Sequence, residues 1–186
     1  PAGAATNTVC VPFTLDPGEV ETFVVDNVPP PDRDPLTIGY WRNWSTCSGG
    51  DQAAQAERRG GVDAGIYLLD DLLPVMLGDL AITTCEDGVN ILSKRDIETG
   101  RVRSSDGAYG LASQLLGAKL NLASGATPSC VIPIVAEADA LLASIGFDGS
   151  GNFLRSRRGA NWATRAEAVR LAGLLDDYNN RRLDCS

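Results

Sequence analysis

A proline-rich run at residues 28–35, VPPPDRDP, separates two parts of the chain that differ in the spacing of their apolar residues. Before the run, apolar and polar residues alternate, as in a strand with one buried face. After it, apolar residues recur every three or four positions, as in amphipathic helices. The run itself predicts a stiff, extended linker, because proline disfavours helices and central strands. The chain therefore divides into residues 1–27, the linker 28–35, and residues 36–186.

The first part, residues 1–27, is predicted to form a two-stranded β arm. A DPGE turn at 16–19 joins the two strands, since proline and glycine favour tight turns. A lone hairpin is marginally stable in water, so we expect the arm to pack on the downstream helices, another domain or another chain. The apolar residues that we assign to the arm are Val9, Val11, Phe13, Leu15, Phe23 and Val25.

The part after the linker, residues 36–186, is predicted to be a mainly α domain of four to six packed helices. The polar, glycine-bounded segment 48–61 is expected to form a loop with one short helical turn. We expect Pro74 to kink or split the first long helix, since proline clashes with the preceding turn. Periodic apolar residues predict helices at 63–80, 83–96, 106–123, 128–146 and 161–179.

The helix expected at 106–123 has the widest apolar stripe, which predicts that it is the central helix of the domain. Gly110, Ser113 and Gly117 form a second stripe of small residues, which suits the close approach of another helix.

Signals for helix ends occur at three places. Thr83 with Glu86, and Thr164 with Glu167, have the spacing of capping boxes. Gly146 is suited to end the helix at 128–146, because glycine readily adopts the left-handed conformation.

The five cysteines are widely spaced, and none belongs to a C-x-x-C pair. Without metal partners, such cysteines indicate disulfides and an oxidising, extracytoplasmic location. Four cysteines allow three pairings, and sequence does not choose among them. We favour Cys47–Cys85 and Cys130–Cys185, which leaves Cys10 to pair with an upstream segment or another chain.

Composition and charge argue against several classes of function. The chain has 16 basic and 24 acidic residues and a net charge of −8, which repels nucleic acids and anionic membranes. No apolar run is long enough to predict a membrane span. The start, PAGAATNTVC, lacks the basic and apolar regions of a signal peptide, so we expect a mature form after signal-peptide removal.

No catalytic constellation is recognisable. Histidine is absent, which removes Ser-His and Cys-His dyads. Neighbouring carboxylates such as Asp70 and Asp71 would point about 100° apart on a helix and do not form a preset acid/base pair. We therefore expect no enzyme and no cofactor. A hydrolase that uses carboxylates alone would need two of them to converge in one cleft.

Asp148, Ser150 and Asn152 lie at alternate positions of FDGSGNF, as the first ligands of a calcium loop do. Gly159 stands where such a loop needs a bidentate glutamate. These three residues are weak calcium candidates, and a tight turn between helices is the favoured interpretation.

Three aromatic residues, Tyr40, Trp41 and Trp44, follow closely after the linker. Exposed rings would offer a stacking surface to a polysaccharide or a surface protein. Buried rings would plug the core where the linker enters the helical domain. We favour the plug and keep the binding surface as the alternative.

The segments LTIGYWRNWSTC, LGDLAITTCEDGVNILSK, YGLASQLLGAKLNLASGA and LLDDYNN occur in an order that resembles a family of uncharacterised secreted bacterial proteins with a Gly-Tyr-Trp-Lys-type motif. The resemblance covers residues 36–186 and implies an extracellular or cell-surface location. It also implies that residues 1–27 are the closing strands of an immunoglobulin-like module. Arg42 replaces the family's lysine, and Trp44 replaces a frequent histidine, so no role of that histidine carries over.

Together these features predict a non-enzymatic secreted or cell-surface structural protein, a subunit of a fibre, sheath or surface layer. The β arm would join copies of the chain, or adjacent modules, by strand addition. The alternative is an extracellular binding module for polysaccharide or a surface protein that uses Tyr40, Trp41 and Trp44.

Overall fold

The computed structural model describes residues 33–127, 130–155 and 161–184. Within these ranges the fold is mainly α, as predicted, with one two-stranded antiparallel sheet. The predicted β arm at 1–27, including Cys10, lies outside the described residues. The helices are α1 (Ile38–Asn43), α2 (Gln52–Arg58), α3 (Cys85–Leu92), α4 (Gly107–Ala123), α5 (Val131–Ser144) and α6 (Trp162–Asn179).

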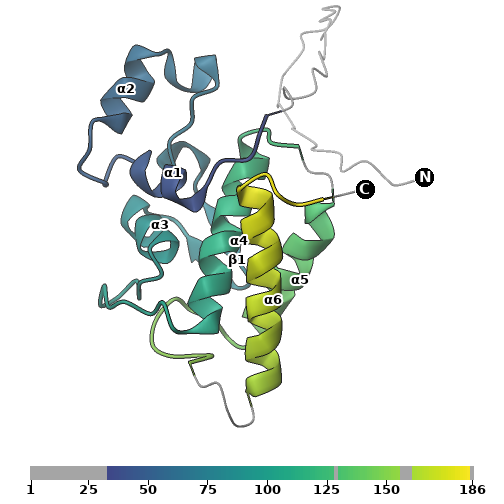
Figure 1. Cartoon of the computed structure of the whole chain (residues 1–186). Helices are drawn as coiled ribbons and strands as arrows, with labels where there is room; N and C mark the ends of the chain where they lie inside the picture. The colour runs from purple at the N-terminus through teal and green to yellow at the C-terminus, as the bar shows by residue number, and fades with distance from the viewer. Residues whose placement is uncertain (1–32, 128–129, 156–160, 185–186) are drawn as a thin grey trace, which may run out of the picture.

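Helix α4 is the central helix of the domain, as its wide apolar stripe predicts (Figure 1). Helix α6 packs along it, and α1, α3, α5 and the first strand also contact it. Thirteen of the 17 residues of α4 are buried, including the polar Ser113, Gln114 and Asn121. A helix that is covered on nearly every side has to find partners for its polar side chains inside the protein.

Gly117 allows α1 and α6 to approach α4 closely. A Cβ atom at this position would lie 2.8 Å from Cγ2 of Ile38 and 3.1 Å from Nδ2 of Asn179. Any side chain at residue 117 would therefore push one of these helices away. The predicted stripe of small residues serves close packing at Gly117, whereas a Cβ at Gly110 would meet open space.

The segment 63–80 is not a helix, contrary to the prediction. Gly65 and Gly78 have φ angles of 73° and 59°, which the interior of a helix does not accommodate, and Pro74 supplies no backbone N–H. The apolar residues here belong to short extended stretches rather than to a helical face. The segment contains 3-10 turns at Gly61–Ala64 and Asp70–Leu72, and strands β1 (Val75–Leu77) and β2 (Leu80–Ile82).

The β1–β2 hairpin is fastened to two helices. The backbone N–H of Gly78 donates to Oδ1 of Asp139 in α5 at 2.8 Å. Lys119 of α4 donates to the carbonyl oxygen of Met76 at 2.6 Å and forms an ion pair with Asp139. A Cβ at Gly78 would lie 2.7 Å from the backbone nitrogen of Ala143, so the hairpin tip requires glycine.

Helix α3 begins one residue later than the predicted capping box. Thr84, not Thr83, is its N-cap: Oγ1 accepts from the N–H of Asp87 at 3.2 Å and donates to the Asp87 carboxylate at 2.8 Å. Asp87 stands at the position of the glutamate in a capping box, but its carboxylate accepts from the hydroxyl of Thr84 rather than from the backbone N–H.

The second predicted capping box does not form. Helix α6 starts at Trp162, so Thr164 lies inside it, and Glu167 forms an ion pair with Arg170 at 2.6 Å. Gly146 follows the end of α5 with a φ of 61°, as the sequence predicts.

Asn121 of α4 uses its whole side-chain amide to join three elements. Its Oδ1 accepts from the N–H of Leu36 at 2.8 Å and from Nε1 of Trp41 at 2.9 Å. Its Nδ2 donates to the carbonyl oxygen of Leu36 at 2.8 Å and to Oδ1 of Asn179 at 2.9 Å. Asn121 is fully buried, and its two lone pairs and two N–H groups are all engaged.

Replacing Asn121 with alanine should lower the free energy of unfolding by about 3 kcal/mol or more, because several buried groups lose their partner at once. Urea denaturation followed by circular dichroism measures the change. The matched control is Asn90→Ala, at a half-buried asparagine of α3 that takes no part in these contacts. If both variants lost the same free energy of unfolding, the hydrogen bonds of Asn121 would not be what holds α1 and α6 on α4.

Candidate functional site

Trp41 forms the plug that the sequence suggests. Its side chain is fully buried, and Nε1 donates to Asn121 in the centre of the domain. A ring in this position has no face for a ligand, so the interpretation of Trp41 as part of a binding surface is wrong.

Tyr40 and Trp44 differ from Trp41, because both are only half-buried. Their rings are stacked, with centroids 5.1 Å apart and planes inclined by 11°. The edge of Trp41 meets Tyr40 at a centroid distance of 5.2 Å. Burial raises the pKa of Tyr40, although the charges of Arg33 and Arg59 oppose the rise. This stacked pair is the part of the aromatic motif that an outside partner would reach.

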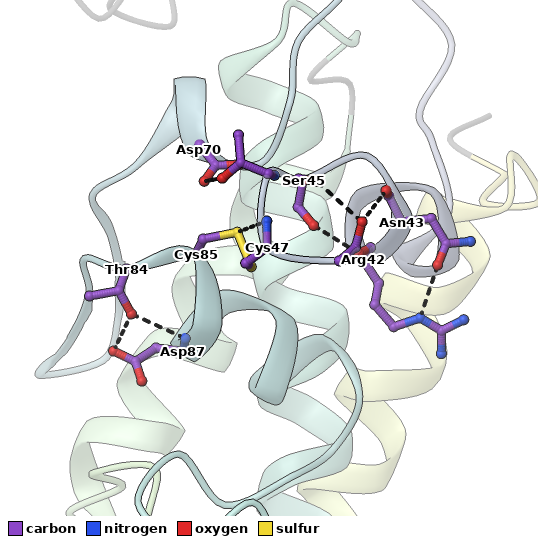
Figure 2. Close-up of a disulfide and its surroundings, with 10 residues drawn as sticks. Arg42, Asn43, Ser45, Cys47, Asp70, Thr84, Cys85 and Asp87 are labelled. Carbon is purple, nitrogen blue, oxygen red and sulfur yellow. Dashed lines mark hydrogen bonds between the residues drawn. A yellow bond between two sulfur atoms is a disulfide. The ribbon is translucent and has the colours of Figure 1, made fainter. Parts of the chain in front are cut away.

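The Cys47–Cys85 disulfide joins the loop after α1 to the first residue of α3, as predicted (Figure 2). The N–H of Cys47 also lies 3.2 Å from the sulfur of Cys85. Beside the disulfide, the backbone N–H and the hydroxyl of Thr46 donate to the Asp70 carboxylate at 2.9 and 2.6 Å. These contacts hold the loop, the 3-10 turn and α3 together.

Cys130 is also disulfide-bonded. The described ranges do not include its partner, since Cys47 and Cys85 bond to each other. The Cys130–Cys185 pairing and the fate of Cys10 stay predictions.

Asp96 is a buried carboxylate that organises two loops. Oδ2 accepts from the guanidinium of Arg103 at 2.8 Å and from the N–H of Gly151 at 2.9 Å. Oδ1 accepts from the N–H groups of Glu98 and Thr99 at 3.2 and 3.0 Å. Burial alone would raise the pKa of Asp96, but these hydrogen bonds outweigh it and hold the pKa well below its usual range.

Asp106, the N-cap of α4, fastens the same loop from the other side. Oδ1 accepts from the N–H groups of Ala108 and Leu154, both at 3.0 Å. Oδ2 accepts from the N–H of Phe153 at 2.9 Å. Sequence reasoning missed both carboxylates. The preference for aspartate at an N-cap would have indicated Asp106, whereas no pattern points to Asp96.

The three calcium candidates form a tight turn, the interpretation that the sequence favours. Oδ1 of Asp148 accepts from the N–H and the hydroxyl of Ser150 at 2.9 and 3.2 Å. Oδ1 of Asn152 accepts from Arg103 at 2.9 Å. The side-chain oxygen of Asn152 is thus engaged by a guanidinium, and no cluster of metal-binding side chains occurs in the part of the chain that the structure describes.

No family model, curated protein or solved structure matches the chain. The resemblance to secreted bacterial proteins therefore stays a prediction. None of the helices in the described ranges has the length and apolar character needed to cross a membrane. The disulfide is compatible with an extracellular protein.

Removing the disulfide with Cys47→Ser and Cys85→Ser together should lower the free energy of unfolding by about 4 kcal/mol, because the unfolded chain regains the entropy of a loop of 38 positions. The midpoint of thermal unfolding should fall by roughly 8–16 °C. In reductant, the wild type and the double variant should unfold at the same temperature. A gap that persists in reductant would mean that the serines, and not the lost bond, cause the change.

Asp96 should make stability depend on pH. Its pKa is lower in the folded than in the unfolded state, so its contribution is present above about pH 4 and is lost as pH falls further. The difference in unfolding free energy between wild type and Asp96→Asn should be largest at pH 7 and shrink towards pH 2. Asp79→Asn, at an exposed position of the β1–β2 turn, is the control variant. A constant difference for Asp96→Asn would contradict the assignment.

Proposed function

We propose that the chain is a non-catalytic structural component of a secreted or cell-surface assembly. In this proposal the helical domain is a rigid body, and residues 1–27 join it to a copy of the chain or to an adjacent module. The observation that carries the proposal is the way in which residues 33–36 are fixed where the chain enters the domain.

Arg33 is held from two sides at this entry. Its carbonyl oxygen accepts from the N–H of Thr127 at 3.2 Å, and it forms a parallel bridge with Ala126. Its guanidinium donates to the carbonyl oxygen of Gly65 and lies over the ring of Tyr67, 5.8 Å from the centroid. The end of α4 and the loop after α2 therefore both fix this residue.

The next three residues are fixed by α4 and by the segment after α6. Arg181 forms an ion pair with Asp34 at 2.9 Å and donates to the carbonyl oxygen of Pro35 at 3.1 Å. Leu36 makes both of its backbone hydrogen bonds with Asn121. Figure 1 shows this segment passing beside the C-terminal end of α6.

Four consecutive residues thus contact four separate parts of the domain. The chain is therefore already held against the domain at residue 33, before the first helix begins. Such a fixed exit suits a protein that positions a neighbour, whereas an independent domain on a flexible tether has no need of it. The Cys47–Cys85 disulfide supports an oxidising location for the assembly.

A charge on the apolar face of the arm should prevent association while the helical domain stays folded. In the full-length chain, Phe13→Asp should weaken self-association at least about tenfold, because a carboxylate at a buried interface is costly. Thr14→Asp adds the same charge at the neighbouring position, which faces the other way in a strand, and should associate like the wild type. Sedimentation and negative-stain electron microscopy measure assembly, and circular dichroism checks the fold.

A wild type that stays monomeric at all concentrations, with and without reductant, would contradict assembly from copies of the chain. It would favour the second candidate, a binding module that contacts a polysaccharide or a surface protein. The half-buried Tyr40–Trp44 stack supports that candidate, and glycan arrays would be the next measurement.

A further inference from the structure

A small cavity of about 130 Å³ lies beside the N-terminal end of α4. Positive and hydrogen-bond-donating side chains from two segments, 101–106 and 152–155, line it. The sequence suggests no site here, because Arg155 is more than 50 positions away from Arg101 and Arg103. The lining residues are Arg101, Val102, Arg103, Ser105, Asp106, Asn152 and Arg155.

Arg103 brings a fixed guanidinium to this cavity. Its two terminal nitrogens are engaged, one with Asp96 at 2.8 Å and the other with Asn152 at 2.9 Å. Its Nε–H is buried and has no acceptor among the described residues. A guanidinium has five N–H donors, so each terminal nitrogen keeps a second N–H that can donate to an oxygen atom in the cavity.

Arg101 and Arg155 add two exposed guanidinium groups that form no ion pair with a described residue. In contrast, Arg170 and Arg182 each contact two carboxylates. The single carboxylate on the cavity wall, Asp106, offsets only part of the charge of the three lining arginines. The cavity is therefore a positively charged place on a chain whose net charge is −8.

The remaining polar groups on the wall are also suited to donate. Oδ1 of Asn152 accepts from Arg103, which leaves the two N–H groups of the Asn152 amide as donors. The hydroxyl of Ser105 can donate as well. A small, donor-rich and positively charged cavity fits an anion that presents several oxygens in a compact shape.

We propose that this cavity binds one tetrahedral oxyanionic group, sulfate or phosphate, with Arg101, Arg103 and Arg155 as its principal donors. The volume is sufficient for a single such group. The group would be a free ion or an ester carried by a larger ligand, such as a sulfated polysaccharide. The site is independent of the β arm and so does not rest on the proposed assembly.

The test uses the full-length chain and inorganic sulfate, with sodium chloride at equal ionic strength as reference. Sulfate stabilises proteins in general by exclusion from their surface, so the diagnostic feature is saturation. We expect a saturable rise of the unfolding midpoint and a matching calorimetric isotherm. Arg101→Gln and Arg155→Gln should each weaken binding about tenfold, since each removes a charge-assisted contact.

Arg58→Gln, at an exposed position in the last turn of α2, is the matched control and should leave the affinity unchanged. Arg103 is left intact, because it also holds Asp96 and Asn152. A rise that never saturates and is equal in all variants would mean that the cavity holds only water, and would overturn the proposal. Equal losses of sulfate affinity in Arg58→Gln and Arg155→Gln would also overturn it.

Two further titrations distinguish the sources of the group. Inorganic phosphate at pH 8 should compete with sulfate for the same site. A sulfated oligosaccharide that binds more tightly than free sulfate, while its desulfated form does not bind, would assign the site to an ester on a polymer. Equal affinities for the oligosaccharide and free sulfate would assign it to the free ion. If neither inorganic anion nor the sulfated oligosaccharide binds, the proposal is wrong.

Discussion

Four hydrogen bonds from the side-chain amide of Asn121 hold the entering chain, α1 and α6 on the central helix. Trp41, Asn121 and Asn179 are buried, so no solvent molecule replaces a partner lost among these three. Gly117, one turn earlier on the same face, leaves the space that lets α1 and α6 come within reach of that amide. The position of Trp41, and with it the aromatic motif, follows from this contact.

The opposite end of α4 is organised in the same way by carboxylates. Asp106 caps the helix and fixes the N–H groups of the loop at 153–154, while Asp96 fixes Gly151 and the guanidinium of Arg103. An apolar helix packs acceptably at several rotations, because burial has no direction. The polar anchors at its two ends each require one geometry, so they determine how the neighbouring segments are placed around α4.

The long helices could be predicted because each repeats its apolar spacing over at least 14 residues. The segment 63–80 could not, since its strands have three residues each and its leucines fit a helical period by chance. Asn121 and Asp96 left no trace in the sequence pattern, because their partners lie up to 85 and 55 positions away. The Cys47–Cys85 bond was one of three possible pairings, and only the fold selects it.

The fixed entry of the chain and the cationic cavity lie at opposite ends of α4. A helix of 17 residues is about 25 Å long, so charges or contacts at one end have little direct effect on the other. The apolar arm would act at the end marked by Asn121, and an anionic group at the end marked by Asp106. Because a rigid helix separates these two contacts, the domain has two chemically different ends. A subunit that lies between two unlike neighbours needs two such ends.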